Sequence, residues 1–268
     1  MDKPRRGLMN PELRKRGIYL LPNSITLAAL FCAFYAIVQG MNGSFEQAAM
    51  FIFYAMVLDG MDGRVARMTH TQSEFGEQLD SLADMVSFGA APALIMYEWA
   101  LKDLGRAGWI AAFIYCAGAA MRLARFNTNI GIIDKRYFQG IPSPAAAALV
   151  AGFIWVMVDT GLPETEQNVR LVAWAAWGIT VFAGVTMVTN LPFYSFKEFN
   201  ARRSVPFVVL PALVLAGYAA VALNPPWALF ILFCAYGVSG YAIWLWNLAR
   251  GKRTEILMKP PAPDEPGS

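Results

Sequence analysis

Four aspartates are the residues of this sequence best suited to chemistry. They form two pairs on either side of a short polar loop, Asp59 with Asp62 and Asp80 with Asp84. An ionisable side chain within an apolar segment is costly unless a neighbour compensates it, so a cluster of four indicates a function. Carboxylates that pack together repel one another unless divalent cations lie between them or some of them are protonated. Oxygen ligands without Cys or His favour Mg²⁺, Mn²⁺ or Ca²⁺ over zinc.

Helical geometry can bring the two pairs of aspartates face to face. A helix turns by about 100° per residue, so positions three, four, seven or eight apart share one stripe. One stripe holds Asp59, Asp62 and Ala66, and the other holds Gly76, Asp80 and Asp84. Two consecutive helices that turn these stripes toward each other would form one acidic site.

Small residues lie beside the carboxylates and either leave space for a bulky ligand or let two helices approach closely. They are Gly60, Gly63, Ala66 and Gly76. Arg64 and Arg67 can donate hydrogen bonds to phosphate oxygens. The alternative is that the aspartates are interfacial charges among helix-packing glycines, which would explain one aspartate better than four.

The elements that carry these stripes are expected to be membrane helices. Of the 268 residues, 57% are hydrophobic and only 15% are charged, which is more apolar than is usual for a soluble domain. Eight apolar stretches are long enough to cross a hydrocarbon core of about 30 Å. They are residues 19–40, 46–66, 76–98, 108–126, 143–161, 169–190, 204–223 and 226–249. The sequence therefore predicts an all-α integral membrane protein of about eight transmembrane helices, with the active site at the cytoplasmic ends of the second and third.

The positions of Lys and Arg predict the orientation, because these residues are retained on the cytoplasmic side. With the N-terminus inside, all but three of the 22 Lys and Arg residues lie in cytoplasmic segments, and the exceptions are Lys102, Arg106 and Arg170. Both termini and the acidic site would then face the cytoplasm from the inner membrane. The net charge of +3 gives no reason to expect a nucleic-acid partner.

Three regions are expected along the chain. Residues 1–17 form a basic cytoplasmic N-terminal segment, and residues 18–250 form a transmembrane catalytic domain. Residues 251–268 form a flexible cytoplasmic tail, because their prolines cannot continue a helix.

The spacing from Asp59 to Asp84 resembles the signature of the CDP-alcohol phosphatidyltransferase family. That signature is D-x-x-D-G-x-x-A-R, eight residues, G, three residues, D, three residues, D, and every fixed position is met. The resemblance implies that two divalent metals bind at the aspartates, with Mg²⁺ or Mn²⁺ expected and Ca²⁺ a further candidate, and that Asp84 is also the base for the incoming alcohol. The metal ligands would be Asp59, Asp62, Asp80 and Asp84.

The resemblance also implies a site for the CDP-linked lipid. The segment Leu21–Thr26 is similar to the start of the first helix in these enzymes. Residues that would border the CDP-lipid are Asn23, Thr26, Gly63, Ala66, Arg67 and Gly76. A homodimer among membrane lipids is a further implication of the family.

Two segments resemble the phosphatidylserine synthase branch of this family, Arg122–Asn127 and Phe138–Ala147. They imply transfer of a phosphatidyl group from CDP-diacylglycerol to L-serine, which gives phosphatidylserine and CMP. A serine carboxylate or a phosphate needs a cation, and the candidates that hold it are Arg122, Arg125 and Asn127. The alternative is that both arginines only mark the helix end at the membrane surface. Ser143 is expected to cap the following helix.

Three other functions fit the sequence less well. Another family member could use glycerol 3-phosphate or an inositol phosphate as acceptor, but the two branch segments argue against it. A divalent-cation transporter would place its carboxylates near the bilayer midplane, whereas these cluster toward one end of their helices. A purely structural membrane protein would leave the acidic signature unexplained.

Overall fold

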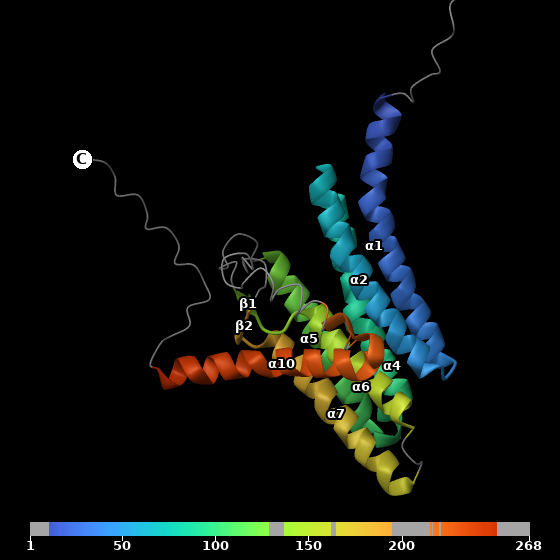
Figure 1. Ribbon diagram of the computed structural model, residues 1–268, viewed down its shortest axis with the longest axis vertical. Coiled ribbons are helices and arrows are strands. Elements are labelled where there is room, and N and C mark those ends of the chain that lie inside the picture. Colours follow the sequence, from blue (N-terminus) through green and yellow to red (C-terminus); the bar gives the residue numbers. More distant parts are fainter. Residues whose placement is uncertain are drawn as a thin grey trace, which may run out of the picture.

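The computed structural model describes residues 11–128, 137–161, 165–194, 215, 217–219 and 221–250. Most of these residues are helical (Figure 1). The long helices are α1 (Pro11–Met41), α2 (Phe45–Thr69), α3 (Glu74–Asp84), α5 (Arg106–Thr128), α6 (Ser143–Thr160), α7 (Glu166–Val188) and α10 (Pro225–Ala249). The third predicted span is one continuous helical run in which α3 is followed by η1 (Met85–Ala90), α4 (Ala91–Met96), η2 (Tyr97–Leu101) and η3 (Lys102–Leu104).

Within the described residues, six helical segments are long and apolar enough to cross a membrane. They are Leu20–Met41, Glu74–Leu104, Arg106–Thr128, Ser143–Thr160, Glu166–Val188 and Pro225–Ala249. Helix α2 has 25 residues but is not among them, because its second half carries Asp59, Asp62 and two arginines. The helical membrane protein is therefore confirmed. The count of eight spans stays a prediction, because most of residues 204–223 lie outside the described part of the chain.

Two features differ from the sequence prediction. Helix α1 begins at Pro11, within the segment that was expected to be separate from the membrane domain. A short antiparallel ribbon also forms between β1 (Tyr137–Gln139) and β2 (Pro192–Tyr194), with Phe138 opposite Phe193. The all-α prediction missed this ribbon because its two strands lie far apart in the sequence and each has only three residues.

The helices pack mainly in pairs. Helices α1 and α2 form a long antiparallel hairpin that projects beyond the rest of the bundle in Figure 1. Helix α2 also packs on α6, which in turn packs on α10, and α5 packs on α7. In the view of Figure 1, α10 runs across the bundle at a steep angle to α1 and α2.

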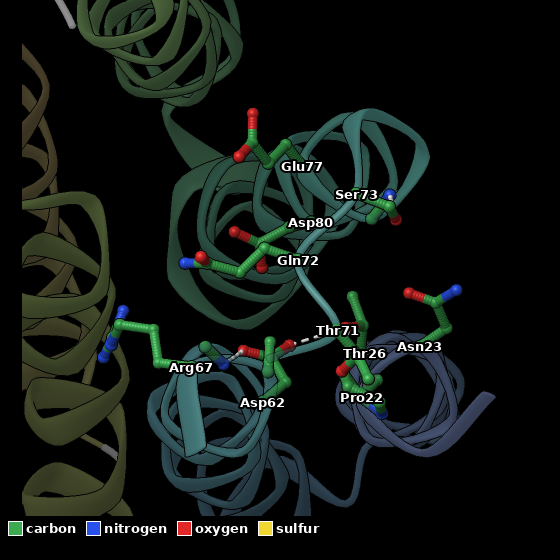
Figure 2. Close-up of a pocket in the computed structure, with 13 residues that line it drawn as sticks. Pro22, Asn23, Thr26, Asp62, Arg67, Thr71, Gln72, Ser73, Glu77 and Asp80 are labelled. Atoms are coloured by element: carbon green, nitrogen blue, oxygen red, sulfur yellow. Dashed lines mark hydrogen bonds between the residues drawn. The ribbon is translucent and has the colours of Figure 1, made fainter. Parts of the chain in front are cut away.

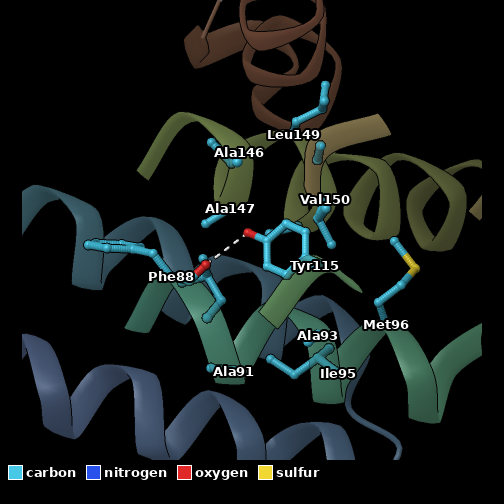
Figure 3. Close-up of a cluster of buried hydrophobic side chains, with 14 of the residues drawn as sticks. Phe88, Ala91, Ala93, Ile95, Met96, Tyr115, Ala146, Ala147, Leu149 and Val150 are labelled. Atoms are coloured by element: carbon cyan, nitrogen blue, oxygen red, sulfur yellow. Dashed lines mark hydrogen bonds between the residues drawn. The ribbon is translucent and has the colours of Figure 1, made fainter. Parts of the chain in front are cut away.

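The buried core is built mainly from small side chains, which lets the helices approach closely. At the crossing of α5 and α7, a Cβ added to Gly118 would collide with the backbone of Gly184. Figure 3 shows the central cluster, in which the ring of Tyr115 lies between residues of α4 and α6. The hydroxyl of Tyr115 donates a hydrogen bond to the carbonyl oxygen of Phe88 at 2.9 Å.

Candidate active site

A four-residue connection brings the stripes of α2 and α3 together. His70 adopts the left-handed conformation with φ of 53° and ends α2, and the N–H of Thr71 returns to the carbonyl of Ala66 at 3.0 Å. Helix α3 then begins with Ser73 as its N-cap, whose hydroxyl accepts from the N–H of Gly76 at 3.1 Å. Backbone groups at the end of α2 and at the start of α3 thus find hydrogen-bond partners within the turn itself, which helps to fix the orientation of α3 relative to α2.

Three of the four aspartates meet at one point. Asp59, Asp62 and Asp80 each offer a carboxylate oxygen, and these three oxygens lie within 4.8 Å of one another. The fourth carboxylate, that of Asp84, lies beside Asp59 and within electrostatic range of the Arg122 guanidinium. The predicted juxtaposition of the two stripes is therefore present in the structure.

The environment of each carboxylate differs. Asp62 is only 5% exposed and is held at both oxygens, by the hydroxyl of Thr26 at 2.7 Å and by the N–H of Gly63. One oxygen of Asp80 and one of Asp84 are buried and have no hydrogen-bond partner in the described part of the chain. Buried polar atoms of this kind are normally satisfied by a partner, so both oxygens fit ligands for a cation. The all-oxygen donor set suits Mg²⁺, Mn²⁺ or Ca²⁺.

A pocket of about 200 Å³ opens beside this cluster, between α1, α2 and α3. Figure 2 shows Asp62 and Asp80 approaching it from α2 and α3, with Asn23 and Thr26 contributed by α1. All six residues predicted to border a CDP-lipid line this pocket: Asn23, Thr26, Gly63, Ala66, Arg67 and Gly76. The structure adds lining residues that the sequence argument did not name: Pro22, Thr71, Gln72, Ser73 and Glu77. Glu77 could have been found, because it precedes Asp80 by three residues on the same helix face.

The glycines of the pocket serve two different purposes. A Cβ added to Gly76 would lie 3.2 Å from both the side-chain oxygen of Asn23 and the hydroxyl of Ser73, so this glycine allows α3 to approach α1. A Cβ at Gly63 would meet only a guanidinium nitrogen of Arg67, at 3.6 Å. Gly63 therefore leaves room on the pocket side of α2.

Arg122 lies on the inner side of the cluster, near the end of α5. Its Nη1 donates to the hydroxyl of Ser143 on α6 at 2.8 Å, and its guanidinium lies within electrostatic range of Asp84 and Tyr236. Its Nε is buried without a hydrogen-bond partner among the described residues. The expectation that Ser143 caps α6 is wrong, because Pro142 occupies the N-cap position and the Ser143 side chain makes no capping bond there. The hydroxyl of Ser143 accepts from Arg122 instead.

Arg125 and Asn127, the other acceptor candidates, contact protein groups. The guanidinium of Arg125 donates to four backbone carbonyls, those of Gln139, Met187, Val188 and Thr189, and to the side chain of Asn190, at 3.0 to 3.3 Å. It thus joins the end of α5 to the C-terminus of α7 and to β1. Asn127 donates to the hydroxyl of Ser81 on α3 at 2.8 Å.

A helical membrane protein with a carboxylate cluster beside a pocket is the class that this fold and site define, and the comparisons narrow it. A profile of the CDP-alcohol phosphatidyltransferase family matches residues 19–186. A CDP-diacylglycerol–serine O-phosphatidyltransferase of Helicobacter pylori is 35% identical over 233 residues, which cover 87% of this chain and 94% of the relative. The chain therefore belongs to the CDP-alcohol phosphatidyltransferase family.

Relatives from other organisms have the same name. The CDP-diacylglycerol–serine O-phosphatidyltransferase of Mycobacterium leprae is 28% identical over 228 residues, with 83% of this chain and 74% of the relative covered. That of Saccharomyces cerevisiae is 37% identical over 145 residues, with 49% and 52% covered. The names of all three relatives specify serine as the acceptor.

Proposed function

We propose that this protein transfers the phosphatidyl group of CDP-diacylglycerol to the hydroxyl of L-serine, which gives phosphatidylserine and CMP. The observation that carries the proposal is the meeting of the signature residues around one pocket: six CDP-lipid candidates line it, and the carboxylates of Asp59, Asp62 and Asp80 converge beside it. The names of the similar proteins support serine as the acceptor.

The donor half of the site is assigned to α1, α2 and the start of α3. Asn23 and Thr26 offer polar groups on one wall, and Arg67 offers an exposed guanidinium on the other. Gly63, Ala66 and Gly76 give the pocket its width and its close helix approach. A cytidine nucleotide with its phosphates toward Arg67 and the carboxylates would satisfy these groups.

The aspartates are assigned as ligands for two divalent ions, Mg²⁺ or Mn²⁺. Asp59, Asp62 and Asp80 would hold them, together with Asp84, which lies beside Asp59 and has one buried oxygen without a hydrogen-bond partner among the described residues. When bound, such ions neutralise the charge of a pyrophosphate and of its leaving group. Hydrogen bonds from Thr26 and Gly63 already fix the orientation of the Asp62 carboxylate, so at least one ligand is in place before a substrate binds.

In the proposed reaction, the serine hydroxyl oxygen attacks the phosphorus that bears the diacylglycerol. A new P–O bond forms to serine, and the P–O bond to CMP breaks, so CMP leaves with the bonding electron pair. Asp84 accepts the hydroxyl proton as general base. Arg122 lies within electrostatic range of Asp84, so a serine whose carboxylate binds this guanidinium would have its hydroxyl near the base.

Arg122 is the preferred acceptor ligand among the three sequence candidates. Its Nε has no hydrogen-bond partner among the described residues, whereas both terminal nitrogens of Arg125 donate to protein carbonyls. Asn127 would support the site through Ser81, which follows Asp80 directly.

The remaining assignments belong to the same proposal. Residues 1–17 and 251–268 would be cytoplasmic segments flanking a membrane domain of residues 18–250, with the site facing the cytoplasm from the inner membrane. The cytoplasmic excess of Lys and Arg supports this orientation. A homodimer is proposed from the family alone.

The decisive experiment is an assay of purified protein with CDP-diacylglycerol, Mn²⁺ or Mg²⁺ and radiolabelled L-serine, with lipid products separated by thin-layer chromatography. Phosphatidylserine and an equal amount of CMP are expected. Glycerol 3-phosphate and inositol phosphates are tested in parallel, and preference for either would overturn the serine assignment. Uptake of divalent cations into proteoliposomes, without release of CMP, would instead indicate a cation transporter.

A further inference from the structure

The helical run that carries Asp80 and Asp84 changes its register directly after Asp84. Residues Met85–Ala90 form the π-helical segment η1, in which the N–H of Ala91 bonds to the carbonyl of Val86, five residues earlier. Short π segments within α-helices are uncommon and frequently occur at functional sites. This one separates the carboxylates from the membrane core of the same helix.

Pro92 gives a local cause for the wider turn. In a regular α-helix the carbonyl of Phe88 would accept from the N–H of residue 92, but proline has no N–H and its ring collides with that carbonyl. Tyr115 of α5 supplies the missing donor, because its hydroxyl bonds to the carbonyl oxygen of Phe88 at 2.9 Å. Both Tyr115 and Phe88 are 0% exposed, so water does not provide an alternative partner.

The hydroxyl of Ser87 is a second sign of the altered register. A buried hydroxyl in an α-helix can bond to the carbonyl four residues earlier, as that of Thr180 does to Ala176 at 2.7 Å. Ser87 is 1% exposed, yet its oxygen has no partner in the described part of the chain. Within the π segment, Ser87 therefore lacks the kind of backbone bond that Thr180 makes on α7.

The register change affects where Asp84 points. In an uninterrupted α-helix, residues seven and eleven positions after Asp84 share its stripe, and these are Ala91 and Ile95. Ile95 is 2% exposed and lies against Gly40 of α1, whereas Asp84 adjoins Asp59 of α2. A π turn rotates the segments on its two sides by roughly 100° relative to an α turn, which lets the two side chains face different helices.

We propose that Tyr115 is a positioning residue for Asp84. By bonding to the Phe88 carbonyl, Tyr115 stabilises the π turn that Pro92 induces, and this turn aims Asp84 at the carboxylate cluster while Ile95 stays in the apolar core. The proposal rests on the proposed function, because turnover of phosphatidyl transfer is its main measurement.

Tyr115→Phe removes only the hydroxyl. We expect kcat to fall by about 10- to 100-fold with both Michaelis constants within about twofold of wild type, because a misaimed base impairs the chemical step more than binding. Thr180→Val is the matched control, since it removes another fully buried hydroxyl bonded to a helix carbonyl, on α7. At equal loss of thermal stability, Thr180→Val should keep wild-type turnover.

Pro92→Ala tests the same turn from the opposite direction. Alanine restores the N–H and removes the ring collision, so the segment can return to α-helical register, and thermal stability should be kept or raised. Turnover should nevertheless fall, which a merely structural role for these residues does not predict. In Pro92→Ala, the further change Tyr115→Phe should have little additional effect on kcat, because the Phe88 carbonyl then has a backbone donor.

Three outcomes would overturn the positioning role of Tyr115: wild-type kcat in Tyr115→Phe, an equal loss in Thr180→Val, or additive losses in the double variant. A failure of the proposed function is recognised separately, because the wild-type protein itself would then make no phosphatidylserine.

Discussion

Thr26 and Asp62 lie on different helices, and the hydroxyl of Thr26 donates to Oδ2 of Asp62 at 2.7 Å. Both residues are buried, at 5% exposure each. The first helix therefore takes part in the carboxylate cluster without contributing a carboxylate. Hydrogen bonds of this kind fix the orientation of a metal ligand, and their loss commonly weakens metal binding.

Thr26→Val should raise the Mn²⁺ concentration needed for half-maximal activity by about 10- to 100-fold, because the Asp62 carboxylate loses its fixed orientation. Thr26→Ser keeps the hydroxyl and should stay close to wild type. The measurement is a Mn²⁺ titration of initial rates at saturating CDP-diacylglycerol and serine. If Thr26→Val changes only the Michaelis constant of the CDP-lipid, Thr26 contacts the nucleotide rather than orienting Asp62.

Asp59→Ala, Asp62→Ala and Asp80→Ala should each weaken activation by divalent ions, because each removes an oxygen from the convergent set. Glu74→Gln is the control, since Glu74 is an exposed carboxylate in the first turn of α3 that does not line the pocket. Binding of Mn²⁺ to each purified variant can be followed by electron paramagnetic resonance, independently of turnover. Undiminished Mn²⁺ binding in all three alanine variants would remove the metal assignment.

Asp84→Asn keeps the shape of the side chain but cannot accept the proton of the alcohol. We expect turnover to fall by roughly 10²-fold or more, while protection of the protein by CMP against thermal unfolding is largely retained. The two measurements together separate a base from a nucleotide ligand. Near-normal turnover would exclude Asp84 as the base.

Arg122→Lys and Arg125→Lys should behave differently. Lysine at 122 keeps the charge but loses the planar fork, so the serine Michaelis constant should rise by roughly 10- to 150-fold, with a smaller change for CDP-diacylglycerol. Lysine at 125 cannot reach four carbonyls at once, so thermal stability should fall with little selective change in serine affinity. A selective rise in the serine constant for Arg125→Lys alone would reverse the two roles.

The proposed orientation predicts labelling from opposite sides. In a protein whose Cys32, Cys116 and Cys234 are replaced by alanine, a cysteine at Ser73 should react with an impermeant reagent from the cytoplasmic face, and one at Thr165 from the other face. Ser73 starts α3 beside the pocket, and Thr165 starts α7. Reaction of both from one side would contradict the topology.

The acidic site was predictable because its information is local. Asp59 and Asp62, like Asp80 and Asp84, follow a helical period, and the period alone places each pair on one face. The pocket residues of α1 could be named only through family resemblance, since nothing in the spacing of Asn23 and Thr26 shows which helix they meet.

Features that depend on packing could not be predicted from spacing. The five hydrogen bonds of Arg125 join it to residues that lie between 14 and 65 positions away in the chain. Such contacts are set by the approach of α5 to α7, which the close pair Gly118 and Gly184 permits. Pro92 indicates an irregularity in the third predicted span, but it does not show that the irregularity is a π turn.

The length of α1 has a consequence for how the reaction would be measured. Its 31 residues extend for about 46 Å, whereas the hydrocarbon core of a bilayer is about 30 Å thick. A membrane-spanning α1 would therefore extend beyond this core by several turns. Asn23 and Thr26 lie at the start of the apolar span Leu20–Met41, which the proposed topology puts where acyl chains give way to headgroups. A donor anchored by its tails would reach this level by two-dimensional diffusion, so the rate in detergent micelles should follow the mole fraction of CDP-diacylglycerol at the surface rather than its bulk concentration.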